Sequence, residues 1–168
     1  MISLLFPSCT RLLALLTVTV VAISSGAEAQ GESGLAVPRF VSVRADEVNV
    51  RTGPGVRYPI DWVFVRRDMP VEIVGEYGAW RQIRDWQGTS GWVHVSMLSS
   101  KRTIIVSKLL TLRNGAGQHA PPVAQAEPGV IGKLLECNTR WCRIEIGAYR
   151  GWVERAGVWG VYPNEVSR

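Results

Sequence analysis

The sequence predicts an all-β protein, with two small β-barrels in tandem after a leader segment that is removed. Three observations support this prediction. The 17 glycines and 9 prolines are spread along the 168 residues, which favours short strands and tight turns over long helices. Short segments alternate apolar and polar residues, as half-buried strands do. A motif in the first half of the chain also returns in the second half.

The first 29 residues have the pattern of a signal peptide. The run from Leu12 to Ile23 is uncharged, but it is shorter than the roughly 20 residues that a membrane-spanning helix needs. Ala27 and Ala29 provide the small side chains that signal peptidase accepts, and Cys9 would leave with the peptide. The alternative is an uncleaved N-terminal anchor. We expect a mature chain from Gln30 that is exported, either periplasmic or secreted, with no transmembrane segment of its own.

Four later segments with period-two alternation are expected to be strands of the first barrel. Each places a polar residue between two apolar ones, and glycines separate them; the segments are Val41–Val43, Val48–Val50, Val71–Ile73 and Val93–Val95.

A repeat divides the mature chain into two modules of similar length. Three matches occur in the same order and at nearly constant separation, which is hard to obtain by chance. They pair Val48–Gly55 with Leu110–Gly117, Trp80–Ile83 with Trp141–Ile144, and Gly91–Val93 with Gly151–Val153. We therefore expect a linker over residues 30–39, one domain over 40–100 and a second over 101–164.

The positive net charge of +5 belongs to the second module. Residues 101–164 contain nine Lys or Arg against four Glu, whereas residues 40–100 contain seven residues of each sign. An anionic envelope surface is the matching partner, with Arg140, Arg143 and Arg150 as its candidate contacts. The alternative is an ordinary solvated surface. Nucleic acid is not expected as a partner of an exported chain.

Cys137 and Cys142 are expected to form a disulfide across a hairpin. Asn138 and Thr139 favour a turn, and four intervening residues place the two cysteines opposite each other on antiparallel strands. An oxidising compartment supports the bridge. In the first module the repeat places Glu76 and Arg81 at these positions, so an exposed ion pair is expected there.

The repeated motifs resemble the bacterial SH3-like family (SH3b). The resemblance rests on Val48–Gly55, a central Trp80 and the Gly91–Val93 motif, and it extends over nearly all of residues 40–160. The second copy departs from the pattern at Ala116, where the family has proline. The resemblance implies two five-stranded SH3-like barrels and a non-catalytic role in exported or envelope proteins. It also implies peptide or glycan ligands of the cell wall.

The candidate ligand-binding residues lie mainly in the first loop of the first module. An exposed tyrosine and tryptophan beside an arginine and an acid can stack on a sugar or a peptide. These residues are Arg57, Tyr58, Asp61 and Trp62. Alternatively, Trp62 and Tyr58 are core residues. The second module has Ala120 and Ala124 at the aligned positions, so a groove of this kind is expected only in the first.

The remaining tryptophans divide into two groups. Trp80, Trp92, Trp141 and Trp152 occupy matched positions in both modules, so a core role is expected, although strict alternation places Trp92 opposite Val93. Trp86 and Trp159 have no counterpart. They are expected to be exposed or to lie between the modules, and Trp86 is the fifth candidate ligand-binding residue.

Catalysis, cofactors and metal binding have little support. His94 and His119 lie in different modules without a third ligand nearby, and a hydrolase built from Cys142 and a histidine would require the disulfide to be absent. We therefore expect no enzyme activity, no cofactor and no metal. The expected function is recognition of a peptidoglycan stem peptide, a glycan or another peptide through the first domain. The alternative is a structural adaptor that docks an envelope protein or an anionic surface through the second domain.

Overall fold

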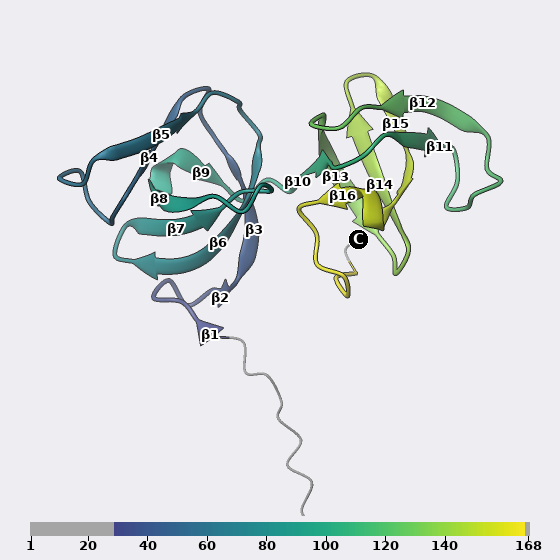
Figure 1. Ribbon diagram of the computed structural model, residues 1–168. Helices are drawn as coiled ribbons and strands as arrows, with labels where there is room; N and C mark the ends of the chain where they lie inside the picture. The colour runs from purple at the N-terminus through teal and green to yellow at the C-terminus, as the bar shows by residue number, and fades with distance from the viewer. Residues whose placement is uncertain (1–28, 167–168) are drawn as a thin grey trace, which may run out of the picture.

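The computed structural model describes residues 29–166, and this part of the chain is all-β, as predicted (Figure 1). Two antiparallel sheets of seven strands each form the two modules, and β1 (Ala29–Gln30) pairs with β2 (Ala36–Val37) ahead of them. Within the described range, no helix is long and apolar enough to cross a membrane. The predicted signal peptide falls on residues 1–28, which lie outside the described range, and on Ala29.

The first sheet has the strand order β5-β4-β8-β7-β6-β3-β9. A single 3-10 turn, Val95–Met97, separates its last two strands in sequence. The strands are β3 (Arg39–Val43), β4 (Val48–Arg51), β5 (Ile60–Phe64), β6 (Pro70–Tyr77), β7 (Trp80–Arg84), β8 (Ser90–His94) and β9 (Leu98–Ser99).

The second sheet repeats this topology strand for strand, in the order β12-β11-β15-β14-β13-β10-β16. The repeat inferred from the sequence is therefore confirmed. Each sheet contains seven strands rather than the five that the resemblance implies, and one of the seven, β9 or β16, is only two residues long. The strands are β10 (Thr103–Val106), β11 (Leu110–Arg113), β12 (Pro122–Ala126), β13 (Ile131–Cys137), β14 (Trp141–Ile146), β15 (Tyr149–Glu154) and β16 (Val158–Trp159).

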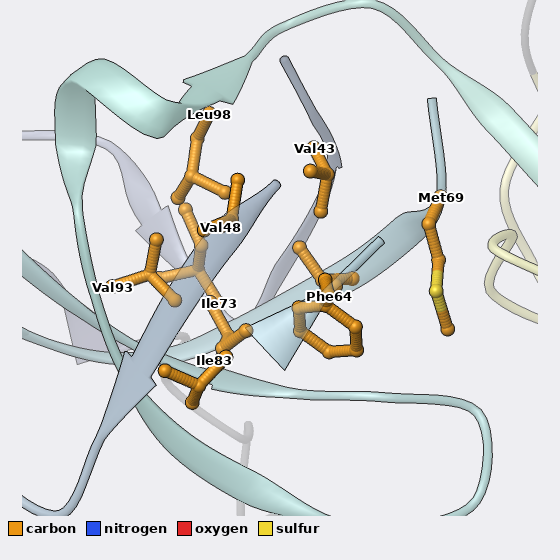
Figure 2. Packing of buried hydrophobic residues seen from close by; sticks show 10 residues of the cluster. Val43, Val48, Phe64, Met69, Ile73, Ile83, Val93 and Leu98 are labelled. Atoms are coloured by element: carbon orange, nitrogen blue, oxygen red, sulfur yellow. The ribbon is translucent and has the colours of Figure 1, made fainter. Parts of the chain in front are cut away.

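Mainly aliphatic side chains fill the core of each module, and Phe64 and Met69 join them in the first. In the first module, alternate residues of the strands point inward and meet around Ile83 and Val93, which are completely buried (Figure 2). The second core is built in the same way around Ile104, Ile144 and Val153. Such a core is too small to enclose a ligand, so any ligand must bind at the surface.

A close crossing of two strands explains the glycine of the Gly-Trp-Val motif. At Gly91 in β8, a Cβ atom would overlap the Val50 side chain and approach the Arg51 carbonyl oxygen to 3.2 Å. At Gly151 in β15, it would lie 3.0 Å from the carbonyl oxygen of Arg113. Only glycine lets β8 and β15 pass this close to β4 and β11.

The matched tryptophans are not core residues as a group. Trp141 is buried, but Trp80, Trp92 and Trp152 are only half-buried and belong to neither core. The core role predicted for these three was wrong. Successive side chains of a strand point to opposite faces of the sheet, so those of Trp92 and Trp152 point away from the buried Val93 and Val153.

Trp86 and Trp159 have different surroundings. Trp86, expected to be exposed or to lie between the modules, is half-buried and packs against the first core, as does Trp62. Trp159 lies between the modules as predicted, with its ring 4.9 Å from that of Phe40.

The segment expected to be a linker is docked on the β6–β7 hairpin. Its Ser33 donates from its backbone N–H (2.7 Å) and its hydroxyl (2.8 Å) to the carboxylate of Glu76. Arg39 donates to the same carboxylate at 2.6 Å, and Arg81 lies 3.1 Å away. The predicted pairing of Glu76 with Arg81 across the hairpin is confirmed. Their predicted exposure is wrong, because the docked segment covers the carboxylate completely.

Contacts between the modules join them into one packed unit. The Phe40 ring lies 4.6 Å from that of Tyr162, and Ile131 packs against the core of the first module. The Tyr162 hydroxyl donates to the buried Glu72 carboxylate at 2.8 Å. Burial and this hydrogen bond raise the pKa of Tyr162, so the phenol stays protonated as the donor. Because the interface is apolar and hydrogen-bonded, separating the modules would expose core-like surface.

The Gly91→Ala variant tests the strand crossing. We expect it to lower the free energy of unfolding by about 1–3 kcal/mol, because the added methyl overlaps well-packed neighbours. Urea denaturation of the whole chain measures the change. Gly117→Ala is the matched control, because a Cβ there meets no atom within 4 Å. Equal stability of the two variants would contradict the crossing.

The Glu76→Gln variant tests the buried carboxylate. Burial alone would raise the pKa of Glu76, but the hydrogen bonds from Ser33 and Arg39 outweigh it and lower the pKa from 4.5 to about 2. Because the pKa of Glu76 is lower in the folded chain than in the unfolded one, the carboxylate stabilises the fold at pH values above the unfolded pKa. This stabilisation is lost as the pH falls from about 4.5 towards 2. At neutral pH we expect Glu76→Gln to cost about 3 kcal/mol, because a buried pair loses one partner.

Denaturation between pH 2 and pH 7 measures this dependence. The variant should lack the part of the acid-induced loss that Glu76 causes. The control is Asp46→Asn, which removes an exposed partner of Arg67 and should leave neutral stability nearly unchanged. Equal acid sensitivity of Glu76→Gln and the parent chain would refute this role of the carboxylate.

Candidate functional site

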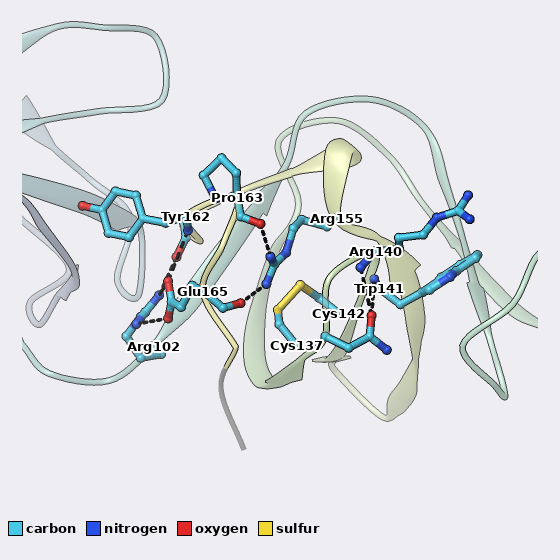
Figure 3. Close-up of a disulfide and its surroundings, with 11 residues drawn as sticks. Arg102, Cys137, Arg140, Trp141, Cys142, Arg155, Tyr162, Pro163 and Glu165 are labelled. Atoms are coloured by element: carbon cyan, nitrogen blue, oxygen red, sulfur yellow. Dashed lines mark hydrogen bonds and ion pairs between the residues drawn. A yellow bond between two sulfur atoms is a disulfide. The ribbon is translucent and has the colours of Figure 1, made fainter. Parts of the chain in front are cut away.

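A disulfide-closed loop forms one side of the candidate site, which lies in the second module. Cys137 and Cys142 are bonded and face each other across the β13–β14 hairpin, as predicted. The Asn138 side chain accepts hydrogen bonds from the backbone N–H groups of Arg140 (3.0 Å) and Trp141 (2.8 Å) (Figure 3). The loop is therefore held both covalently and by hydrogen bonds. It presents Arg140 and Trp141 next to η2, the 3-10 turn Arg155–Gly157.

The chain that follows β16 forms the opposite side. The buried Arg155 guanidinium donates to the backbone carbonyl oxygens of Pro163 and Glu165 (Figure 3). Glu165 in turn accepts from Arg102, at 2.6 Å for the shorter contact. Burial would raise the pKa of Glu165, but the Arg102 hydrogen bond outweighs it and lowers the pKa. Two arginines and the Tyr162–Glu72 hydrogen bond thus fix this terminal segment.

Two hollows have Trp141 and Glu154 in common among their lining residues, and these two stand opposite each other on β14 and β15. We call them together the Trp141 hollow. One part has a volume of about 530 Å³ and an apolar wall made of Ala156, Val158, Val161 and Pro163. The other has a volume of about 570 Å³ and is lined on its polar side by Lys108, Arg113, Gln118 and His119.

Charges of both signs face this hollow. Lys108, His119 and Arg140 are exposed cationic or titratable groups, and the Glu154 carboxylate is held by Gln118 at 3.3 Å. Because Trp141 is only 8% exposed, it serves as a floor and not as a free stacking surface. The arrangement suits a ligand that carries carboxylate and amine groups next to an aliphatic portion.

The first-module residues predicted to bind a ligand do not converge on one surface. The Tyr58 ring packs over the backbone of Gly53, where a Cβ would collide with it, and Arg57 lies 5.3 Å from the centre of this ring. Trp62 turns toward the core and meets Phe64 edge-on at 6.1 Å. Asp61 remains exposed on β5, and Trp86 packs against the core. Core packing therefore accounts for Trp62 and Trp86.

Two of the three arginines expected at an anionic surface are in ion pairs. Arg143 lies 3.2 Å from Glu136, and Arg150 pairs with Glu145. Only Arg140 faces the Trp141 hollow. The cross-strand carboxylates thus neutralise part of the basic patch that composition suggested.

The two histidines have different roles. His94 stacks edge-on against Trp80 at 5.4 Å and caps the first 3-10 turn by accepting from the Ser96 N–H. His119 lines the Trp141 hollow. Among residues 29–166, no group of three His, Cys, Asp or Glu side chains is placed to hold a metal ion.

Sequence reasoning missed the parts of this site that come from distant segments. Glu154, Lys108 and the wall from Val158 to Pro163 carry no motif, and the wall is in place only because the segment after β16 folds back on Arg155. One available signal was the asymmetry of the repeat. Glu154 replaces His94 and Arg155 replaces Val95 at matched positions.

Family comparison agrees with this architecture. The model of the family described as "Bacterial SH3 domain" matches residues 44–100 and 106–160, one match for each module. The chain belongs to the bacterial SH3 domain family. Its two matched segments correspond to the two sheets, so the predicted SH3-like resemblance is confirmed for both copies.

One curated relative is described as "Putative N-acetylmuramoyl-L-alanine amidase YrvJ" from Bacillus subtilis. The identity is 30% over 142 residues, covering 77% of this chain and 26% of the relative. This pair of bacterial SH3 domains therefore spans about a quarter of the relative's length.

Two solved structures from Trichomonas vaginalis, NlpC2 and NlpC1, are 12% identical to this chain, each with a TM-score of 0.34. They cover 73% and 77% of this chain, and the matches cover 48% of each of those chains.

Replacing both cysteines with serine tests the closed loop. We expect the Cys137→Ser/Cys142→Ser chain to lose about 2 kcal/mol of unfolding free energy, because the bridge closes a short loop. Denaturation with and without reductant measures this loss: reductant should destabilise the parent chain and leave the variant unaffected. The whole chain is used, because the modules share a packed interface. Two titratable thiols in an oxidised, folded chain produced from Gln30 onward, without Cys9, would contradict the bridge.

Proposed function

We propose that this chain is an exported, non-catalytic cell-wall-binding protein, with its ligand in the Trp141 hollow. The observation that carries the proposal is a surface hollow with charges of both signs and an apolar wall, in a chain made of two bacterial SH3 domains. A short wall peptide offers the matching chemistry, because it combines free carboxylates, amines and aliphatic side chains.

Three further observations support binding without catalysis. The bridged Cys142 has no free thiolate, and His94 is used as a cap. The relative named as a putative amidase is about four times longer than the matched part, so its activity is not carried over.

Export is supported by the signal-peptide pattern and by the bridge, which persists in oxidising compartments.

The geometry favours the second domain over the first as the ligand site. In the first domain, Tyr58 and Trp62 are engaged with Gly53 and Phe64, whereas Lys108, Arg140 and Glu154 of the second face an open hollow. The remaining proposal, an anionic surface docked by the basic module, is weakened by the ion pairs of Arg143 and Arg150.

Retention of the protein on purified sacculi tests the proposal. We expect Lys108→Gln/Arg140→Gln to weaken retention about tenfold, because hydrogen bonds to charged groups contribute about 1.5 kcal/mol or more. The matched control is Arg143→Gln/Arg150→Gln, which removes the same number of positive charges away from the hollow. Co-sedimentation at low and high salt provides the measurement.

The outcomes separate the alternatives. Loss in the first variant alone supports the hollow as the ligand site. An equal loss of retention in both variants, together with parent-chain retention that disappears at high salt, would favour an anionic surface instead. Retention unaffected by either double substitution would contradict both electrostatic models.

A further inference from the structure

The outer edge of β5 in the first domain is the open edge of the sheet. In the sheet order, β5 pairs with β4 on one side only, so the backbone groups along its other side are not used by the sheet. Unpaired strand edges accept extended peptides by adding a strand.

A groove runs along this edge. It has a volume of about 350 Å³, with Trp62, Phe64 and Met69 among its lining residues and the turn from Asp85 to Thr89 on the other side. We call it the β5 groove. Its rim is apolar as well as open: Val63 is 37% exposed and Val65 is 73% exposed.

The charge in the β5 groove is positive. Arg66 is exposed in its lining and forms no ion pair within residues 29–166. The carboxylate that also lines it, Asp85, is nearly buried and accepts hydrogen bonds from the N–H groups of Gln87 (2.9 Å) and Thr89 (2.8 Å). A ligand therefore meets a free guanidinium and an occupied carboxylate.

The second domain lacks this combination at the matched edge. There β12 begins at Pro122, where β5 begins at Ile60, and Pro128 follows soon after its end. Proline protects an edge strand because it removes backbone donors. Ala124 and Ala126 also replace Trp62 and Phe64. The exposed edge of β5 is thus a property of the first domain and not of the repeat.

We propose that the β5 groove binds an extended segment of a partner protein, with apolar residues at alternate positions and an acidic residue opposite Arg66. The partner strand pairs with β5 through its backbone, and its alternate side chains lie over Phe64 and Met69. A second copy of this chain is the other possible occupant, and the test below distinguishes it. This inference does not rest on the Trp141 hollow.

Selection from a phage-displayed library of random peptides on the whole folded chain tests the proposal. We expect enriched peptides to alternate apolar residues and to carry an acidic residue. Synthetic versions should bind in fluorescence anisotropy at least tenfold more weakly to Val63→Lys, which places a charge on the rim. The matched control is Val123→Lys on β12, which is 40% exposed and should bind like the parent chain.

Two further measurements distinguish strand addition from other modes. N-methylation of alternate peptide amides should abolish binding, because it removes the backbone donors that would pair with β5. Charge reversal in Arg66→Glu should shift the preference from acidic to basic peptides.

Three outcomes would overturn the proposal: no enriched alternating sequence, equal binding to Val63→Lys and the parent chain, or self-association of the chain that Val63→Lys abolishes. The last would mean that a second copy occupies the groove. Sacculus retention is unaffected by Val63→Lys if the two sites are independent, so failure here leaves the wall-binding proposal separately testable.

Discussion

Packing between the two domains determines the shape of the candidate site. Phe40 of the first domain lies against Trp159 and Tyr162 of the second, and the Tyr162 hydroxyl reaches the buried Glu72 across the interface. These contacts hold the segment that walls the Trp141 hollow. The residues that line the hollow belong to the second domain, but its shape depends on contacts with the first. The tandem arrangement therefore does more than repeat a domain: each copy affects the structure of the other.

The two copies solve the same local problem with different chemistry. Each long hairpin, β6–β7 or β13–β14, needs its two strands joined near the turn. In the second domain a covalent bond does this between Cys137 and Cys142. In the first, the Glu76 carboxylate accepts hydrogen bonds from Ser33 and Arg39, forms an ion pair with Arg81 and is fully covered. In the first domain, burying the Glu76 carboxylate costs desolvation free energy. This cost is offset only while all of its hydrogen-bond and ion-pair partners are in place.

Local patterns in the sequence were sufficient for the fold and insufficient for the site. Alternation, turn residues and the repeat predicted the strands, the hairpin register and the disulfide, because each depends on neighbours in sequence or on a matched copy. At Trp92 two such patterns disagree. The matched tryptophan in the other copy suggested a core role, but alternation along the strand turns the Trp92 side chain to the face of the sheet opposite the buried Val93. The Trp141 hollow was not predictable, because Lys108 and Pro163 are each brought near Trp141 and Glu154 only by long-range packing.

Differences between the copies are more informative about function than their similarities. Shared features such as Gly91 and Gly151 are explained by strand crossing and carry no information about ligands. At matched positions, the first domain has Trp62 where the second has Ala124, and the second has Glu154 where the first has His94. Neither change is required by the common fold, since the other copy folds without it. Glu154 lines the Trp141 hollow, and Trp62, which also packs against the core, lines the β5 groove. The two domains are therefore expected to recognise different partners.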